Sequence, residues 1–304
     1  MENQCIAVAR RLGFDPIIKR VKMRAPWKQL SPWGLRIGNR WSLAPEGDQL
    51  DGPLPDLLIA TGRHSVTSSL AVRDMTGGKC LRVQIQNPGI DPRHFDLVVV
   101  PRHDRLSGPN VLVTRGAPHG VTPQGLELAR EKFADRFAHL PHPRITLLLG
   151  GNNGVYRLNQ LAARNLAECL STLARGTQGS VLVTPSRRTG AAIEDLFRKT
   201  LAGVQGEIWD GKGDNPYLAY LAYADHIVVT ADSVNMVCEA ASTGKPVHVV
   251  PLDGGSDKFR RFHEGLVEDG ITRPFHGALD SWSYETFDDT ALVAARVREM
   301  LSAR

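Results

Sequence analysis

The sequence has few cysteines and no long apolar run, and each absence excludes a class of protein. Its four cysteines lie far apart and none has a CxxC or CxxH spacing, so neither a zinc site nor a disulfide framework is supported. No apolar run reaches the ~18 residues that a membrane span needs, and the chain does not open with the apolar stretch of a secretory signal. We therefore expect a cytoplasmic protein without a metal site.

Positive charge is concentrated in the first fifty residues, which hold nine Lys and Arg against four Asp and Glu, a local excess of +5 in a chain of net charge +5. A face of like charge would attract acidic lipid or a phosphorylated acceptor. The alternative is a solvated basic surface. We expect no nucleic-acid partner, and an association with the inner membrane that is peripheral at most.

Three tryptophans in this stretch, Trp27, Trp33 and Trp41, are interleaved with basic residues. Indole and guanidinium groups both favour membrane interfaces. This loop would then lie on a membrane surface or cover a lipid-linked acceptor. The alternative is that the tryptophans pack against the first domain.

The chain is longer than one hydrophobic core usually serves, which favours two domains. Short apolar runs alternate with turns and helical segments, a pattern typical of parallel sheets with crossover helices. Prolines in HLPHPR (139–144) disfavour helix and indicate a linker. We expect an α/β fold of two Rossmann-like domains, 1–140 and 141–304, with the last helix packing back on the N-terminal domain.

The expected elements follow the apolar runs and the turns between them. The expected strands are 56–60, 81–85, 96–100, 111–113, 145–151, 180–186, 207–209, 226–231 and 246–250. The expected helices are 2–12, 65–75, 124–139, 158–174, 190–201, 217–222 and 233–242. A unit of this kind normally opens with a strand and a Gly-rich turn, whereas this chain opens in a helix, so we expect the first strand of the N-terminal domain to be missing.

The segment HIVVTADSVNMVCEAASTGKPVHVV (226–250) predicts a strand and then a helix that begins near Ser233 and turns Asp232, Met236 and Glu239 away from the core. Asp232 or Ser233 suits the N-cap, and the start of such a helix favours phosphate. The Glu239 carboxylate could accept hydrogen bonds from two ribose hydroxyls. The alternative is a capped surface helix with an exposed glutamate.

Two further blocks follow predicted strands, and GGNN is the first. Gly150 and Gly151 would let the backbone approach a ligand closely, and Asn152 and Asn153 add hydrogen-bond donors. A plain tight turn explains the block equally well.

In the second block, SRRT, Ser186, Arg187 and Arg188 follow the strand SVLVTP. Two guanidinium groups there could neutralise a diphosphate through bidentate hydrogen bonds, without a metal. The alternative is one arginine in a salt bridge and the other in solvent.

In the N-terminal half, TGRHS and PRHD each follow a strand and each supply an imidazole. His64, or His103 beside Asp104, could act as a general base on an acceptor hydroxyl, because imidazole titrates near neutral pH. We expect both to open on a cleft between the domains. A hydrogen-bonded structural role is the alternative for either histidine.

The segment TADSVNMVCEAASTGKPV (230–247) resembles the nucleotide-sugar signature of GT-B glycosyltransferases, in which the glutamate contacts ribose. Nearly the whole chain also resembles bacterial relatives of the plant mitochondrial-fission "elongated mitochondria" family, whose opening strand and Gly-rich turn have no counterpart here. The blocks that carry this second resemblance are PRHD (101–104), NVLVTRGAPHGVTP (110–123), GGNN (150–153), TPSRRTG (184–190), NPY (215–217) and the segment above.

The resemblance implies a GT-B-like fold and a nucleotide-sugar substrate, with no cofactor. The implied reaction is metal-independent glycosyl transfer, with Arg187, Arg188 and the helix after Ser233 on the diphosphate and Glu239 on the ribose. A GT-B-fold nucleoside-diphosphate-sugar epimerase is the first alternative. A non-catalytic, membrane-associated adaptor that keeps the fold is the second.

Overall fold

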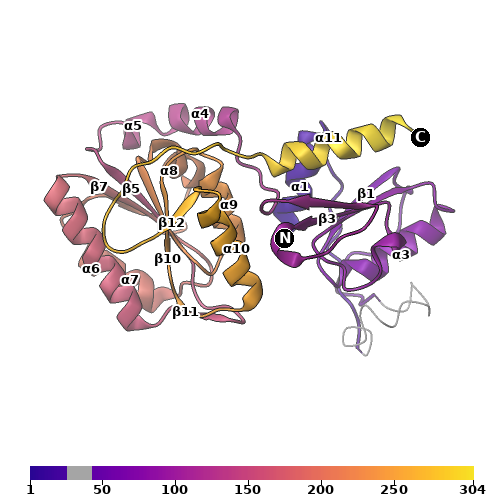
Figure 1. Ribbon diagram of the computed structural model, residues 1–304, viewed down its shortest axis with the longest axis horizontal. Helices are drawn as coiled ribbons and strands as arrows, with labels where there is room; N and C mark the ends of the chain where they lie inside the picture. Colours follow the sequence, from indigo (N-terminus) through magenta and orange to yellow (C-terminus); the bar gives the residue numbers. More distant parts are fainter. Residues whose placement is uncertain (26–42) are drawn as a thin grey trace. The chain divides into compact units, whose positions relative to one another are not determined.

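A computed structural model describes residues 1–25 and 43–304, which form two compact units (Figure 1). One unit comprises Met1–Gly120 and Asp288–Arg304, and the other comprises Val121–Phe287. The second unit thus begins before the expected boundary at 141, because helices α4 (Pro123–Lys132) and α5 (Ala134–Phe137) pack with α8 (Tyr217–Tyr223). No helix of the described residues has the length and apolar character of a membrane span.

The N-terminal unit contains a parallel sheet of β1 (Leu57–Thr61), β2 (Leu81–Ile85), β3 (Leu97–Pro101) and β4 (Val111–Thr114), in that order. Alternate residues of β3 face opposite sides: Leu97 and Val99 pack with α1 (Glu2–Arg11) and α11 (Asp289–Ser302), whereas Val98 and Val100 pack with α3 (Ser65–Met75). The C-terminal helix α11 therefore completes the core of this unit. Short 3-10 turns η1 (Pro92–His94) and η2 (Arg102–Asp104) flank β3.

The C-terminal unit contains a six-stranded parallel sheet in the order β12-β10-β9-β5-β7-β8. Its strands are β5 (Arg144–Leu149), β7 (Ser180–Pro185), β8 (Gln205–Ile208), β9 (His226–Thr230), β10 (Val247–Val250) and β12 (Thr272–Pro274). The chain winds outward from β5 to β8, then returns to the centre at β9 and winds to the other edge. This is the doubly wound arrangement, whose switch point lies between β5 and β9.

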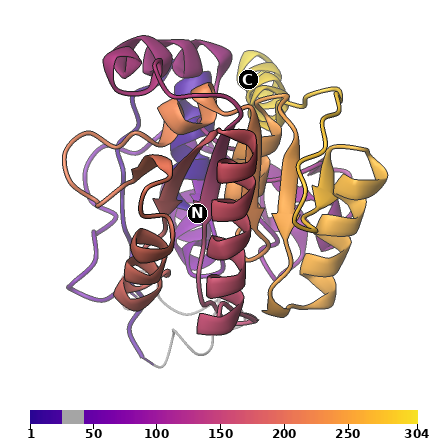
Figure 2. The ribbon, with the colours of Figure 1, turned by 90° about the vertical axis from the view of Figure 1, so that its left-hand side faces the viewer.

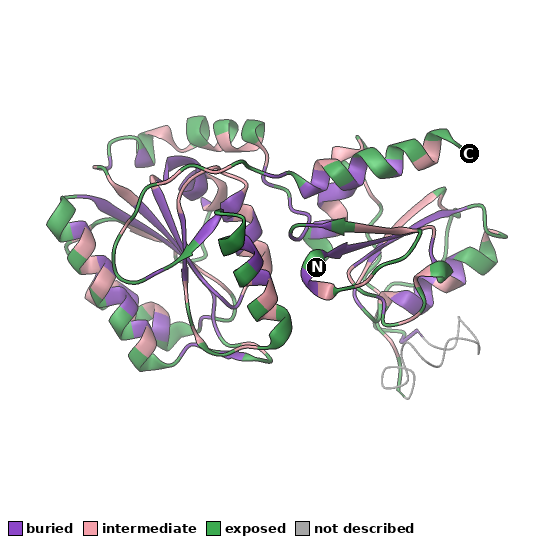
Figure 3. Cartoon of the chain, in the orientation of Figure 1, coloured by how far each residue is buried: buried purple, intermediate pink, exposed green. Residues whose placement is uncertain are grey.

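Helices cover both faces of this sheet, because its strands are apolar on both sides. Ile145 and Val181 pack with α6 (Gln160–Thr177) and α7 (Ala191–Thr200), which stand on the near face in Figure 2. Leu182 points the other way, toward α8. In Figure 3 the central strands are buried, whereas the outer faces of the helices are exposed. The edge strands β8 and β12 are partly exposed. Two parallel sheets covered by helices confirm the expected α/β, GT-B-like fold class.

The strands and helices of this unit lie close to the expected ranges, with α9 (Val234–Ala241) after β9. Three strands were not expected. The two-residue strands β6 (Tyr156–Arg157) and β11 (Asp253–Gly254) pair antiparallel, and β12 follows helix α10 (Asp257–Glu268) at the sheet edge. These strands are too short to show a periodic pattern in the sequence.

Candidate functional site

The loops after β5 and β9 meet at the switch point of the six-stranded sheet. The backbone N–H of Gly151 donates to Oδ2 of Asp232 at 3.2 Å, and the N–H of Gly150 donates to Oγ1 of Thr230 at 2.8 Å. Thr230 Oγ1 in turn donates to Oδ1 of Asp232 at 2.7 Å. The carboxylate of Asp232 therefore joins the ends of two neighbouring strands, at the position where open α/β sheets bind ligands.

A third loop reaches the same carboxylate. Arg188, after β7, donates from Nη2 to Oδ2 of Asp232 and forms a salt bridge in which the Asp232 side chain is fully buried and the Arg188 side chain is 44% exposed. A buried carboxylate needs such a partner, because desolvation penalises an uncompensated charge. The predicted blocks GGNN, SRRT and TADS thus come together around Asp232.

This packing explains the two glycines. A Cβ on Gly150 would lie 1.9 Å from Oδ1 of Asp232, and a Cβ on Gly151 would lie 2.2 Å from the carbonyl oxygen of Arg188. Both contacts are far closer than real Cβ atoms show. Glycine is therefore required here by the protein's own carboxylate and backbone, whatever ligand binds.

The two arginines of SRRT differ in their environment. Ser186 and Thr189 form a tight turn in which Ser186 Oγ accepts from the N–H of Arg188 and Thr189 Oγ1 donates to Leu149 O. Arg188 is held by Asp232, whereas Arg187 is exposed and forms no ion pair within the part of the chain that the structure describes. Arg187 is thus the guanidinium that is available to an anionic ligand.

The asparagines of GGNN form backbone hydrogen bonds. Asn152 Oδ1 accepts from the N–H of Leu158 at 2.8 Å, and Asn153 Oδ1 accepts from the N–H groups of Val155 and Tyr156. These bonds shape the turn that leads to β6, so the turn interpretation accounts for the oxygens of both amides.

Helix α9 begins as expected. Ser233 is its N-cap and accepts from the N–H of Met236 at 3.4 Å. Its first turn therefore lies directly after Asp232, at the carboxyl edge of the sheet, where the helix dipole favours an anion.

Glu239, more than one turn into α9, is paired with a residue that the sequence did not single out as functional. Its Oε2 accepts a short hydrogen bond from the hydroxyl of Tyr217, the first residue of α8. The side chain of Asn215 accepts from the N–H of Tyr217 at 3.0 Å and fixes the start of that helix. The NPY block (215–217) therefore delivers the tyrosine that orients Glu239.

Burial dominates the electrostatics of this pair. It raises the pKa of Glu239 above its ordinary value, and the hydrogen bond from Tyr217 opposes that rise. It also raises the pKa of Tyr217 well above 10, and the neighbouring carboxylate adds to the effect. Tyr217 is therefore a hydroxyl donor that favours the ionised form of Glu239.

In the N-terminal unit, β1 and β3 place His64 and His103 at the same edge of the four-stranded sheet. His64 is exposed at the N-cap of α3. Nε2 of His103 lies 3.6 Å from Oδ1 of Asp104, and both side chains are almost fully buried. His103 and Asp104 thus lie close together at more than a hydrogen-bond distance, and both their role as a general base and the expected cleft between the domains stay predictions.

Sequence comparison shows the family of this chain, and structure comparison shows its fold. The model of the family described as "Mitochondrial fission ELM1" matches residues 1–301. The chain belongs to this family. It is 34% identical over 290 residues to "Mitochondrial fission protein ELM1" of Arabidopsis thaliana, covering 86% of this chain and 67% of that protein. It is 26% identical to "Uncharacterized protein RP120" of Rickettsia prowazekii (strain Madrid E), covering 83% of this chain and 81% of that protein.

This ELM1-family chain also shares its fold with UDP-GlcNAc 2-epimerase from Methanocaldococcus jannaschii. The TM-score is 0.55 at 14% identity, covering 82% of this chain and 77% of that one. A structure of that enzyme with UDP-GlcNAc and UDP gives a TM-score of 0.54. The superposition shows a common fold, and at this identity it shows nothing beyond the fold, which is the GT-B-like fold expected from the sequence.

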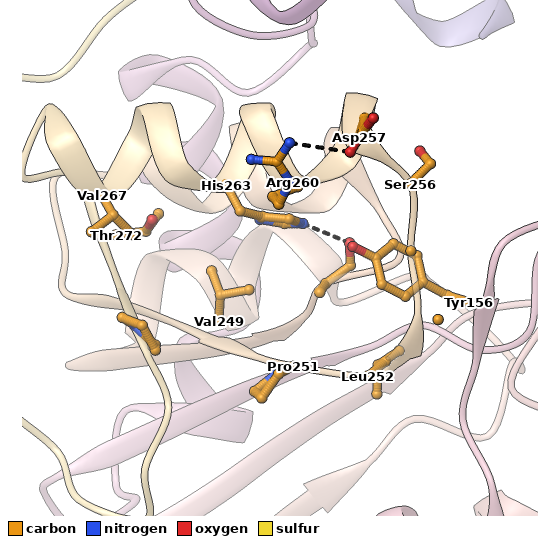
Figure 4. Close-up of a pocket in the computed structure, with 14 residues that line it drawn as sticks. Tyr156, Val249, Pro251, Leu252, Ser256, Asp257, Arg260, His263, Val267 and Thr272 are labelled. Carbon is orange, nitrogen blue, oxygen red and sulfur yellow. Dashed lines mark hydrogen bonds and ion pairs between the residues drawn. The ribbon is translucent and has the colours of Figure 1, made fainter.

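A hollow of about 480 Å³ lies beside the loops that meet at Asp232, between helix α10 and strand β10 (Figure 4). Ala231, the neighbour of Asp232, is part of its wall, but Arg187, Arg188 and Glu239 do not line it.

Within the described residues, no three His, Cys, Asp or Glu side chains gather as metal ligands. The tryptophan loop expected to meet a membrane, with Trp27, Trp33 and Trp41, lies outside the described residues.

Proposed function

We propose that the C-terminal unit of this ELM1-family protein binds a nucleotide-sugar at the carboxyl edge of its six-stranded sheet, and that the protein transfers the glycosyl group to an acceptor without a metal ion. The observation that carries the proposal is the convergence of three loops on Asp232 at the switch point between β5 and β9. This crevice is where doubly wound sheets bind ligands.

The diphosphate would lie at the start of α9, near Arg187. The helix dipole contributes roughly half a positive charge there, and Arg187 adds a guanidinium that is free among the described residues. Arg188 has a different role: it neutralises Asp232, so that the carboxylate does not repel the phosphates. The leaving nucleoside diphosphate would then be stabilised by these groups.

The ribose would be held by Glu239. Tyr217 occupies Oε2 of its carboxylate, and Oε1 has no hydrogen-bond partner among the described residues. An ionised carboxylate accepts hydrogen bonds from vicinal hydroxyls through both oxygens. Tyr217 acts in this scheme as a positioning residue.

The acceptor side belongs to the N-terminal unit. The base would be His64, or His103 with Asp104, and the basic first fifty residues would favour a lipid-linked or membrane-surface acceptor. The Asp104 carboxylate, 3.6 Å from Nε2 of His103, would stabilise the imidazolium that forms when the base accepts a proton.

Epimerisation of a nucleotide-sugar is the second candidate, because a solved structure of the same fold is named UDP-GlcNAc 2-epimerase. The two reactions separate in one experiment, in which the protein is incubated with labelled nucleotide-sugars in the absence of an acceptor. An epimerase changes the sugar under these conditions, whereas a transferase leaves it intact until an acceptor membrane extract is added. Calorimetric titration with UDP, GDP and CDP tests both, since the absence of binding contradicts both and leaves the non-catalytic adaptor.

The role given to Arg188 has its own test. Arg188→Met leaves the buried Asp232 carboxylate uncompensated, so we expect nucleoside-diphosphate affinity to fall by about tenfold or more. Adding Asp232→Asn to the same chain removes the repulsion and should restore much of the lost affinity. If the double variant binds no better than Arg188→Met, the arginine contacts the ligand directly.

A further inference from the structure

We propose that the hollow between β10 and α10 is a binding site for a neutral sugar ring, recognised by Tyr156, His263 and Thr272. This inference rests on the proposed function only where the sugar is taken to be that of a nucleotide-sugar. A free acceptor sugar has the same chemistry, and the experiment below separates the two sources.

The hollow combines an apolar floor with a few uncharged polar groups. Its lining includes the apolar side chains of Val249, Pro251, Leu252, Val267 and Pro274. Its volume of about 480 Å³ falls in the range of roughly 300–1,000 Å³ that is typical of small-molecule sites. Such a lining suits a ligand with an apolar ring face and hydroxyl groups at its edge.

The opposite charges of its two charged lining residues, Arg260 and Asp257, neutralise each other. Arg260 and Asp257 line the mouth of the hollow and form an ion pair at 3.1 Å (Figure 4). Arg260 also contacts Glu264 at 3.0 Å. The mouth therefore offers no unpaired charge, which favours a neutral ligand over a phosphate or a carboxylate.

Tyr156 supplies an aromatic wall and an available hydroxyl. It is 6% exposed, and its ring packs edge-on against Phe259 with a centroid distance of 5.0 Å. A Cβ on Gly255 would lie 3.4 Å from the Tyr156 ring, so the glycine lets the loop pass close to it. The Tyr156 hydroxyl has no hydrogen-bond partner among the described residues, and it can donate to or accept from a ligand hydroxyl.

His263 determines which chemistry the ligand must bring. Its Nε2 lies 2.9 Å from the carbonyl oxygen of Ala231, which can only accept, so Nε2 carries the hydrogen (Figure 4). Burial lowers the pKa of His263 and keeps the ring neutral. Nδ1 is then an acceptor, and it is buried with no partner among the described residues. A ligand hydroxyl would donate to it.

Thr272 adds a second buried group of this kind. The residue is 1% exposed, and its Oγ1 has no hydrogen-bond partner within the described chain. Buried polar groups without a partner cost stability. Two such atoms, Nδ1 of His263 and Oγ1 of Thr272, belong to residues that line one hollow, and a ligand hydroxyl that reached them would complete their hydrogen bonds.

The hollow also adjoins the proposed nucleotide site. Ala231 lies between Thr230 and Asp232, and the charge of Asp232 contributes to raising the pKa of Tyr156, after burial. A sugar in the hollow could therefore belong to a diphosphate held at the start of α9.

The test uses Tyr156→Phe and Thr272→Val, which remove the two hydroxyls without a described partner. Both variants should keep or raise the melting temperature, because each removes an unpaired polar group. Tyr284→Phe is the matched control: its hydroxyl contacts the carbonyl oxygens of Ala241 and Lys245 at 2.9 and 2.8 Å, so its melting temperature should fall while sugar binding is unchanged.

Binding is measured by calorimetry with UDP, UDP-glucose, UDP-N-acetylglucosamine, GDP and GDP-mannose, and by NMR of ¹⁵N-labelled histidine with free glucose and N-acetylglucosamine. If the donor is the source, one nucleotide-sugar binds about tenfold tighter than its nucleoside diphosphate, and Tyr156→Phe removes that gain without changing the nucleoside-diphosphate affinity. If a free sugar is the source, it shifts the Nδ1 resonance of His263, and Tyr156→Phe abolishes the shift.

The inference is overturned if sugar binding is absent, or is unchanged in Tyr156→Phe and Thr272→Val. It is equally overturned if these variants lose stability as Tyr284→Phe does. A failure of every nucleoside diphosphate to bind contradicts the proposed function instead, and the free-sugar measurement then decides the inference alone.

Discussion

Replacing Tyr217 by phenylalanine tests the most specific contact of the candidate site. The change removes one hydroxyl and keeps the ring, so Glu239 loses its donor while the packing of α8 is retained. A hydrogen bond to a charged group contributes about 1.5–3 kcal/mol. We expect the free energy of unfolding to fall by about this amount at pH 7.

The cost should depend on pH, and the sign follows from the pKa of Glu239. Burial raises this pKa above 4.5, and the Tyr217 hydroxyl lowers it by stabilising the ionised form. Without the hydroxyl the native pKa rises further, because the ionised form of Glu239 loses more stabilisation than the protonated form does. A raised native pKa lowers stability as the pH rises through it. The cost should therefore be largest at pH 7 and shrink to about 1 kcal/mol at pH 4, where a protonated Glu239 loses only a neutral hydrogen bond.

Urea denaturation between pH 4 and 8 measures this, with Tyr223→Phe as the matched control. Tyr223 lies in the same helix, and its hydroxyl donates to the carbonyl oxygen of Arg130 at 2.9 Å, an acceptor that does not titrate. Its cost should not change across this range. Equal costs at pH 4 and pH 7 for Tyr217→Phe would refute the coupling to Glu239.

Three further predictions follow from single residues. Gly150→Ala should lower the free energy of unfolding by about 3 kcal/mol or more, as measured by urea denaturation, because the new Cβ displaces the buried Asp232 carboxylate. Gly154→Ala is the control: a Cβ there has no atom within 4 Å, so the loss should be under about 1 kcal/mol. Burial, and after it the neighbouring imidazole of His226, lowers the pKa of His248 from 6.5 to about 4. The free energy of unfolding of the wild type should therefore fall by up to about 3 kcal/mol as the pH drops from 6.5 to 4. In His248→Phe this part of the pH dependence should be absent from urea denaturation. Arg187→Gln should weaken nucleoside-diphosphate binding by about tenfold or more and reduce its salt dependence, and calorimetry at two ionic strengths measures both.

Much of the fold could be predicted from the sequence, because its strands are continuous apolar runs bounded by turns. LVVV in β3 and HIVVT in β9 are buried on both faces, which is the pattern that parallel strands require. The boundary between the units was harder to place. Helices α4 and α5 belong to the second unit because they pack on Tyr220 and Tyr223, a contact that no local sequence pattern indicates. The proline-rich segment at 139–144 lies inside the second unit and is not a linker between the units.

The candidate site could be predicted only in part. Parallel strands end at one edge of a sheet, and this rule predicted that the loops of Gly150, Arg188 and Asp232 lie together. In the structure these loops do meet. That Asp232 binds one arginine of the pair depends on the exact path of the SRRT turn, which residue types do not encode. Tyr217 was within reach of sequence reasoning, since NPY belonged to the family resemblance, but its contact with Glu239 joins two helices and has no local pattern.

The charges at the switch point limit how a diphosphate can bind there. Asp232 and Arg188 cancel as a buried pair, so their effect on a phosphate is small, and the positive potential comes from Arg187 and the first turn of α9. Together these supply roughly one and a half positive charges, against one negative charge on each phosphate of a nucleotide-sugar. The phosphates alone would therefore be held weakly, and the affinity would have to come from both ends of the molecule. In the proposed binding mode Glu239, oriented by Tyr217, would hold the ribose, and the hollow beside Tyr156 would hold the sugar, so both would add to the affinity.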